Sequence, residues 1–150
     1  MKLRLIYLSL LISSTYSWAH AQKNDEEIYS INFKTPSGNI ICGGDIKENS
    51  YGVKPWNGVS CLVGINNKPI KQKPKDCDLD WGGMFSLPEK GETKMECYSD
   101  FPFKPDAQIL HYGKKIQGNG WQCTSQPTGL YCNNNTNNGF KINRNQQALF

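Results

Sequence analysis

The segment WQCTSQPTGLYCNN, residues 121–134, has the pattern of a tight, disulfide-bridged β-hairpin. If Cys123 lies opposite Cys132, the remaining residues of the two arms pair in order and leave Pro127 and Thr128 as the bend. Gly129 follows the bend, where glycine can adopt a backbone φ above zero. We therefore predict a two-stranded antiparallel ladder that is closed by a Cys123–Cys132 disulfide.

A similar arrangement occurs near the other end of the chain, in TPSGNIICGG, residues 35–44. Proline, a hydroxyl residue, glycine, a short apolar run and Cys42 follow one another there, as they do before Cys132. Tight turns require these residue types in any case, so we interpret the likeness as shared turn chemistry and not as an internal repeat. Gly38, like Gly129, is predicted to have a positive φ.

The chain contains six cysteines, at positions 42, 61, 77, 97, 123 and 132. An even number in an exported protein indicates a disulfide framework. Cys42 and Cys61 lie in short β-branched runs on either side of the turn-rich segment 45–58, which favours a looser hairpin between them. This leaves Cys77 to pair with Cys97. We prefer these three sequential bridges over the other possible pairings.

A zinc site is not indicated, because no C-x-x-C motif occurs and His111 is the only histidine beyond the N-terminal segment. We expect no cofactor. The segment KDCDLDWGG, residues 75–83, offers three alternating acids for Ca²⁺. However, Trp81 and Leu87 stand where an EF-hand loop requires glycine and a bidentate acid. We interpret the acids as solvated strand residues around an inward-facing Cys77 and Leu79; they are Asp76, Asp78 and Asp80.

Residues 1–21 have the features of a secretory signal peptide. Lys2 and Arg4 precede an apolar run at 5–12 that is too short to span a bilayer, and Ala-His-Ala at 19–21 is a small-x-small cleavage site. The sequence therefore predicts a periplasmic or secreted protein.

The mature chain is predicted to begin at Gln22 and to form a single disulfide-bridged β domain over residues 22–150. Since the first cysteine, Cys42, lies well inside this region, we expect neither a lipid anchor nor any other membrane anchor after cleavage.

The rest of the mature chain alternates short apolar runs with turn residues, without a sustained helical period. We predict an all-β fold, a small disulfide-bridged β-sandwich or barrel built from antiparallel hairpins. Any helix would be a single turn near residues 76–81, and the asparagine tract 133–139 is expected to be an exposed loop. Strands are expected at 27–34, 39–43, 59–65, 83–87, 93–99, 108–113, 121–125, 129–133 and 139–143.

Charge gives no support for a nucleic-acid partner. The whole chain carries a formal charge of +4, and the leader contributes two of its basic residues. The local lysine run between residues 68 and 75 is interrupted by Pro69 and Pro74 and has no interleaved aromatic residue for stacking on bases. We interpret it as a solvated loop.

Several segments together resemble a family of small exported bacterial proteins with no assigned function. The family pattern reads S-P-S-G-N-I-x-C near its start, C-x-L-D-W-G in the middle and G-F-x-x-S-R near its end. The resemblance covers most of residues 33–144, and Thr35 and Asn143 depart from it, each standing where the pattern has serine. It implies the fold boundaries and export, and it implies no catalytic or binding residue. The matching segments are 33–43, 77–83, 95–100, 109–113, 121–125, 129–132 and 138–144.

Enzymatic activity is not expected, because the mature chain has one histidine and no thiol outside the predicted bridges to act as nucleophile or base. A small carboxylate-dependent glycan hydrolase is the alternative, since such an enzyme needs only two acids. Candidate acids are Asp78, Asp80, Glu96 and Asp100.

The favoured hypothesis is an exported, non-catalytic binding or inhibitor module that acts at the cell envelope on a protein or a glycan. The mature chain has three tryptophans, which is many for a domain of this size, and one or two of them are expected to pack in the core; they are Trp56, Trp81 and Trp121. Tyr51 and Trp56 lie on the segment between Cys42 and Cys61, where exposed rings would provide the contact surface.

Overall fold

The computed structural model describes residues 28–47, 52–65, 69–100, 103–104 and 106–150. The predicted signal peptide, residues 1–21, and the predicted binding residue Tyr51 lie outside the described residues. Within the described part, the chain forms β-strands and no helix, and none of it is a helix long and apolar enough to cross a membrane. The all-β prediction is confirmed.

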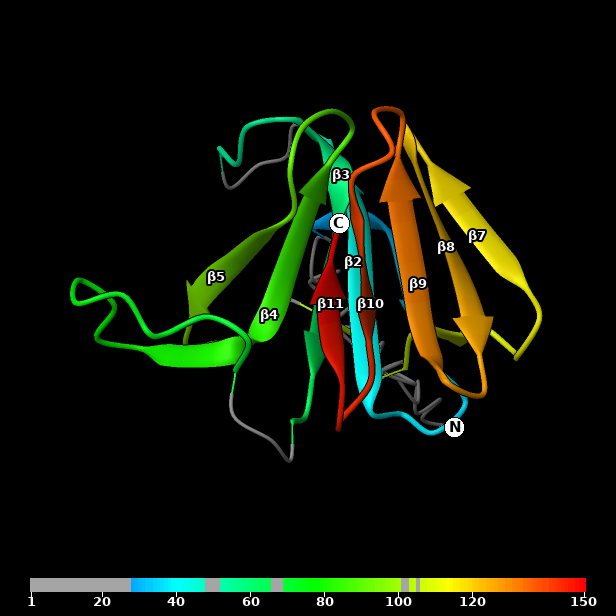
Figure 1. Ribbon diagram of the computed structural model, residues 1–150. Helices are drawn as coiled ribbons and strands as arrows, with labels where there is room; N and C mark the ends of the chain where they lie inside the picture. Colours follow the sequence, from blue (N-terminus) through cyan, green and yellow to red (C-terminus); the bar gives the residue numbers. More distant parts are fainter. Residues whose placement is uncertain (1–27, 48–51, 66–68, 101–102, 105) are drawn as a thin grey trace, which may run out of the picture.

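The strands form two open sheets, which pack face to face as a sandwich (Figure 1). The six-stranded sheet has the order β5-β4-β3-β2-β1-β6 and is antiparallel except for the β1–β6 pair. Its strands are β1 (Tyr29–Lys34), β2 (Ile40–Ile46), β3 (Trp56–Val63), β4 (Asp80–Pro88), β5 (Lys94–Tyr98) and β6 (Gln108–Ile109).

The five-stranded sheet is antiparallel throughout and has the order β11-β10-β9-β8-β7. Its strands are β7 (Lys115–Gly118), β8 (Trp121–Gln126), β9 (Gly129–Asn134), β10 (Gly139–Ile142) and β11 (Gln147–Leu149). Two of these, β7 and β11, were not predicted. Both are edge strands, four and three residues long, which is too short for a clear alternation of apolar residues, so their pairing depends on the neighbouring strand more than on their own pattern.

The core lies between the sheets and follows the period-2 alternation of the strands. In β8, buried Trp121, Cys123 and Ser125 alternate with half-buried residues, and β9 repeats this alternation. The Trp121 ring stacks on Phe33 of the opposite sheet, with the ring centroids 6.4 Å apart. Trp121 therefore meets the expectation that one or two tryptophans pack in the core, and it belongs to the same buried cluster as Cys123 and Cys132.

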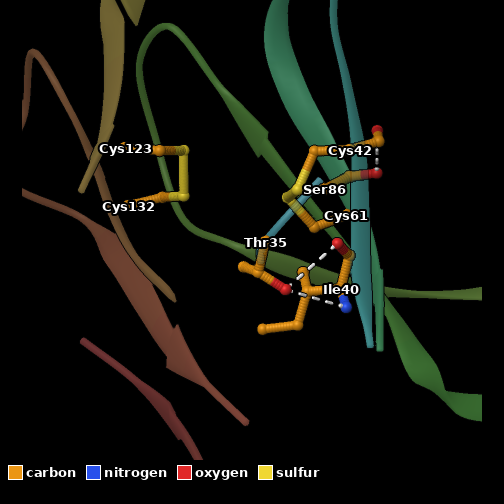
Figure 2. The surroundings of a disulfide bond; sticks show 8 residues. Thr35, Ile40, Cys42, Cys61, Ser86, Cys123 and Cys132 are labelled. Atoms are coloured by element: carbon orange, nitrogen blue, oxygen red, sulfur yellow. Dashed lines mark hydrogen bonds between the residues drawn. A yellow bond between two sulfur atoms is a disulfide. The ribbon is translucent and has the colours of Figure 1, made fainter. Parts of the chain in front are cut away.

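All three predicted disulfides are present. The Cα atoms of Cys42 and Cys61, and likewise those of Cys123 and Cys132, are 4.1 Å apart, because each pair lies directly opposite in an antiparallel ladder. Figure 2 shows these two bridges on different sheets, and all four residues belong to one buried cluster. The third bridge joins Cys77, which precedes β4, to Cys97 of β5, and the Cα atoms of this pair are 5.9 Å apart.

The predicted register of the β8–β9 hairpin is confirmed from Cys123–Cys132 down to Gln126–Gly129. Gly129 and Gly38 have φ angles of 132° and 69°, as predicted. The two similar turns differ in their bridges. Cys132 of β9 is bonded to Cys123 of β8, so this bridge links the two strands that its turn connects. Cys42 of β2 is bonded instead to Cys61 of β3, so its bridge does not link the two strands, β1 and β2, that the first turn connects.

Two local predictions are wrong. Residues 76–79 form neither a helical turn nor a strand, since β4 begins at Asp80, and Leu79 is 46% exposed although Cys77 is buried. The period of two fails here because the Cys77 bridge, and not a ladder, orients this segment. In the asparagine tract, Asn133 and Asn134 belong to β9, and only the following residues form a turn.

A buried carboxylate joins the two sheets. Asp45 of β2 has a φ of 49° and lies at an irregularity in the β2–β3 ladder. Its Oδ1 accepts hydrogen bonds from the Gly58 amide at 3.2 Å and from the Trp121 indole at 2.8 Å, and its Oδ2 accepts one from the Asn119 amide at 2.8 Å. Trp121 belongs to β8 of the opposite sheet, and Asn119 lies in the β7–β8 turn of that sheet.

Asn134 forms a second connection between the sheets. Its side-chain amide donates to the carbonyl oxygen of Pro88 at the end of β4, at 2.9 Å, and to that of Gly91 in the β4–β5 connection, at 2.8 Å. Its Oδ1 accepts from the backbone amides of Thr136 and Asn138 in the turn after β9. A single buried side chain therefore holds two loops from different sheets together.

Candidate functional site

Three tight turns lie at the same end of the sandwich and surround a cleft of about 520 Å³. They are the β1–β2 turn (35–39), the β8–β9 turn (126–129) and the β10–β11 turn (143–146), all at the lower end of Figure 1. We call this site the turn cleft. Its lining residues are Thr35, Ser37, Asn39, Ile40, Tyr112, Gln126, Pro127, Thr128, Gly129, Asn143, Arg144, Asn145 and Gln146.

The first turn is held by its own backbone and by a buried threonine. The Thr35 amide donates to the Ile40 carbonyl at 3.0 Å, and the Gly38 amide donates to the Thr35 carbonyl at 2.8 Å. The Thr35 hydroxyl oxygen accepts from the Ile40 amide at 3.3 Å, an interaction visible beside the Cys42–Cys61 bridge in Figure 2. The Ser37 hydroxyl, which lies on the exposed side of the turn, is 3.3 Å from that of Thr35.

Asn143 connects the second and third turns. Its side-chain amide donates to the Thr128 carbonyl at 2.7 Å. Its Oδ1 accepts from the backbone amides of Asn145 and Gln146, at 2.8 and 2.7 Å, which is the local bonding that asparagine provides in turns. The β10–β11 turn is thereby fixed internally and against the β8–β9 hairpin.

Arg144 connects the third turn to the first. Its Nη2 donates to Asn39 Oδ1 at 3.1 Å, and the Asn39 side-chain amide lies 3.4 Å from the Gly64 carbonyl that accepts from it. Apart from Arg4, Arg144 is the only arginine in the sequence. Among the described residues that line the cleft, it is also the only charged one.

The chemistry of the turn cleft is that of hydrogen bonding to a polar ligand. Its walls present hydroxyls, side-chain amides and one guanidinium group, and Tyr112, which is 47% exposed, adds an aromatic ring. None of the lining residues that the structure describes is an acid, a histidine or a cysteine. Across the described part of the chain, no group of three or more such residues is arranged to hold a metal ion.

The predicted binding residue Trp56 lies elsewhere, on the outer face of the six-stranded sheet. It is the first residue of β3 and not part of an exposed loop, so that placement is corrected. Its half-buried ring covers Gly58, where any Cβ would collide with it. Trp56 lines a groove of about 300 Å³, which we call the outer groove, together with Tyr29, Ile46, Ser60, Met84, Ser86, Pro88, Lys94 and Glu96.

Tyr29 is the most buried aromatic residue of the outer groove. It stacks on Phe103, with the ring centroids 5.3 Å apart. Burial raises the pKa of the Tyr29 hydroxyl, and a hydrogen bond with Ser60 opposes part of that rise. Tyr29 therefore stays neutral over the physiological pH range.

The candidate acids do not meet in the turn cleft. Asp80 lies opposite Tyr98 in the β4–β5 ladder, where burial and the Asp80 charge raise the pKa of the Tyr98 hydroxyl. Glu96 lies opposite Met84 and lines the outer groove. Asp78, Asp80 and Asp100 are exposed, as is Asp76 of the same acidic segment.

Sequence reasoning missed Asn143, Arg144 and Gln126 as site residues. Gln126 lies at a turn that the sequence indicates, whereas Asn143 and Arg144 lie in the turn before β11, a strand that was not predicted. No local signal shows that these turns are neighbours. The available signal was the direction of the strands. In an antiparallel sheet, alternate connections lie at the same end, and the β8–β9 and β10–β11 turns are alternate connections.

Comparison with known proteins places the chain in an uncharacterised group. Residues 8–150 match the sequence profile described as "Family of unknown function (DUF6636)". Searches among curated proteins and among solved structures found no match.

Proposed function

The chain belongs to the family of unknown function DUF6636, and for this member we propose an exported, non-catalytic binding module whose turn cleft holds a polar ligand of the cell envelope. Export is supported by the three disulfides, because such bridges form and persist in oxidising compartments.

The observation that carries the proposal is the cross-linking of the three turns. Asn143 holds the second turn against the third, and Arg144 holds the third against the first. The disulfides Cys42–Cys61 and Cys123–Cys132 brace the strands from which two of these turns arise. A site whose polar groups are already fixed loses little conformational entropy when a ligand binds, which favours recognition.

Binding is favoured over the alternative of glycan hydrolysis by the composition of the cleft. Hydrolysis of a glycosidic bond uses two carboxyl groups that flank it. The turn cleft presents amides, hydroxyls and a guanidinium group, with no carboxyl group among its lining residues. These groups bind sugars and peptides but supply no acid and base for cleavage.

The outer groove is the second candidate contact surface, as the sequence-based hypothesis for Trp56 proposes. The observation in its favour is that the Trp56 and Tyr29 rings lie beside the paired hydroxyls of Ser60 and Ser86, which are 2.8 Å apart. An aromatic surface with a few polar groups is a common recognition arrangement.

One titration distinguishes these possibilities. Isotope-labelled protein is titrated with solubilised cell-wall glycan fragments while backbone amide shifts and glycan cleavage are measured in the same sample. We expect shifts at 35–39, 126–129 and 143–146 with the glycan intact. Shifts confined to residues around Trp56 would move the site to the outer groove, and cleavage would establish the hydrolase.

A matched pair of variants tests the position of the site. Thr128→Gln lengthens an exposed side chain that lines the turn cleft and should weaken glycan binding severalfold. Thr124→Gln makes the same change in β8, at a residue outside the lining of the cleft, and should bind like the wild type. Equal affinities for the two variants would contradict the assignment to the turn cleft.

A further inference from the structure

The single charge of the turn cleft has no acidic partner in the described part of the chain. Arg144 is exposed, and its one hydrogen bond there is the bond from Nη2 to the neutral amide of Asn39. A guanidinium group carries five N–H donors, so most of its donors are available to a ligand. An uncompensated cation in a concave polar site attracts an anion.

The geometry of arginine favours an anion that presents two oxygens side by side. Its rigid, planar fork of N–H groups is matched by the two coplanar oxygens of a carboxylate, and it also binds two oxygens of a phosphate. The bond to Asn39, whose own amide is directed to the Gly64 carbonyl, limits the rotation of the guanidinium group. Arg144 is therefore oriented before a ligand arrives, which favours two parallel hydrogen bonds to one carboxylate.

The remaining groups of the cleft fit a saccharide better than a peptide. The side-chain hydroxyls and amides of Ser37, Thr128 and Gln126 can donate and accept, as sugar hydroxyls do. Several backbone amides of the turns already have acceptors within their own turns: Gly38 donates to the Thr35 carbonyl, Asn143 to the Gln146 carbonyl, and Asn145 and Gln146 to Asn143 Oδ1. A peptide that binds by adding a strand requires free backbone groups along an edge.

We propose that the turn cleft recognises a carboxylate-bearing saccharide, with Arg144 bonded to the carboxylate and the surrounding amides and hydroxyls bonded to the sugar hydroxyls. This inference rests on the proposed binding function and specifies its ligand class. Tyr112, exposed in the lining of the cleft, offers a ring face to the C–H groups of the sugar.

The test is calorimetric titration of the wild-type protein with a trisaccharide of uronic acid units and with the neutral trisaccharide in which hydroxymethyl groups replace the carboxylates. The acidic sugar should bind about tenfold more tightly, the difference typical of a hydrogen bond to a charged group. Arg144→Gln should abolish that preference, and Arg144→Lys should retain only part of it because the fork is lost.

Lys141→Gln is the control, because it removes the same charge from β10, three residues away and outside the lining of the cleft. It should keep the full preference. Thermal melting and intact mass verify that each variant is folded and bridged, which is expected because residue 144 is exposed.

Three outcomes would overturn the inference. If the wild type binds the acidic and neutral sugars equally, the cleft does not recognise a carboxylate, although it can still bind a polar ligand. If Arg144→Gln still prefers the acidic sugar, Arg144 is not the residue that binds the carboxylate. Tighter binding of an acidic tripeptide than of the uronic trisaccharide replaces the saccharide with a peptide ligand. Failure of the proposed function is distinct, because cell-wall glycan fragments would then shift no amide around the cleft.

Discussion

Asp45 shows how much one side chain contributes to this fold. It is buried, it adopts a φ that few residue types tolerate, and three N–H groups donate to its carboxylate, one from β3 and two from the β7–β8 turn and the start of β8. Hydrogen bonds from N–H groups satisfy a buried carboxylate without a neighbouring cation. The residue therefore serves, like Asn134, as a buried polar connection between the two sheets.

Asp45→Ala should lower the free energy of unfolding by about 3 kcal/mol, since it leaves buried donors without an acceptor. Asp45→Asn should cost less, because asparagine keeps one oxygen and tolerates the positive φ. Urea denaturation of the two variants beside Asp106→Ala, an exposed control, measures the difference. If Asp45→Ala unfolded at the same urea concentration as the control, the three hydrogen bonds to the Asp45 carboxylate would contribute nothing to stability.

At the scale of elements, the turns contribute both order and the candidate site. Gly129 combines a positive φ with close approach to β10, so that a Cβ there would collide with the Ile142 carbonyl. Gly38 has a positive φ in open space, with nothing near the position of a Cβ. Substitutions at the two glycines therefore distinguish two contributions to the loss of stability, the strained backbone conformation alone at Gly38 and that strain together with crowding at Gly129.

Gly38→Ala should destabilise the protein by about 1 kcal/mol, the typical cost of placing a residue with a Cβ in the left-handed region. Gly129→Ala should cost more, and Gly129→Val more still, because crowding against β10 is added. Thermal unfolding of the three variants gives the order. Equal losses for Gly38→Ala and Gly129→Ala would mean that the hairpin relaxes away from β10 without cost.

For the whole molecule, covalent bonds and packing act on the same residues. Four of the six bridged cysteines belong to the buried cluster between the sheets, and each bridge is expected to stabilise the fold by about 3 kcal/mol through the unfolded chain. A small domain with a limited core gains a large share of its stability in this way.

Intact-mass measurement of the exported protein should show a chain that begins at Gln22 and is lighter by the mass of the six thiol hydrogens than the reduced form. The physical basis is removal of the predicted leader and closure of all three bridges. Labelling with a thiol reagent under denaturing conditions is the control and should add nothing before reduction. A mass that retains residues 1–21, or two reactive thiols, would contradict the prediction.

Local chemistry explains which features were predictable. The bend between Cys123 and Cys132 has only one register that pairs the arms, so spacing alone determined the hairpin and its bridge. The positive φ of Gly38 likewise follows from the turn residues around it. The same reasoning failed where a long-range bond controls the backbone, as at Leu79 beside the Cys77 bridge.

The all-β class, the three cysteine pairs and the turns at Gly38 and Gly129 were predictable, because apolar alternation, cysteine spacing and turn residues can be read directly along the chain. Tertiary structure alone decided that Asn39 and Arg144, 105 positions apart, share one cleft, and that Trp56 lies over the outer groove. The physical reason is that strand order and sheet packing bring distant turns together, and these depend on the sum of many weak contacts across the core that no local pattern encodes.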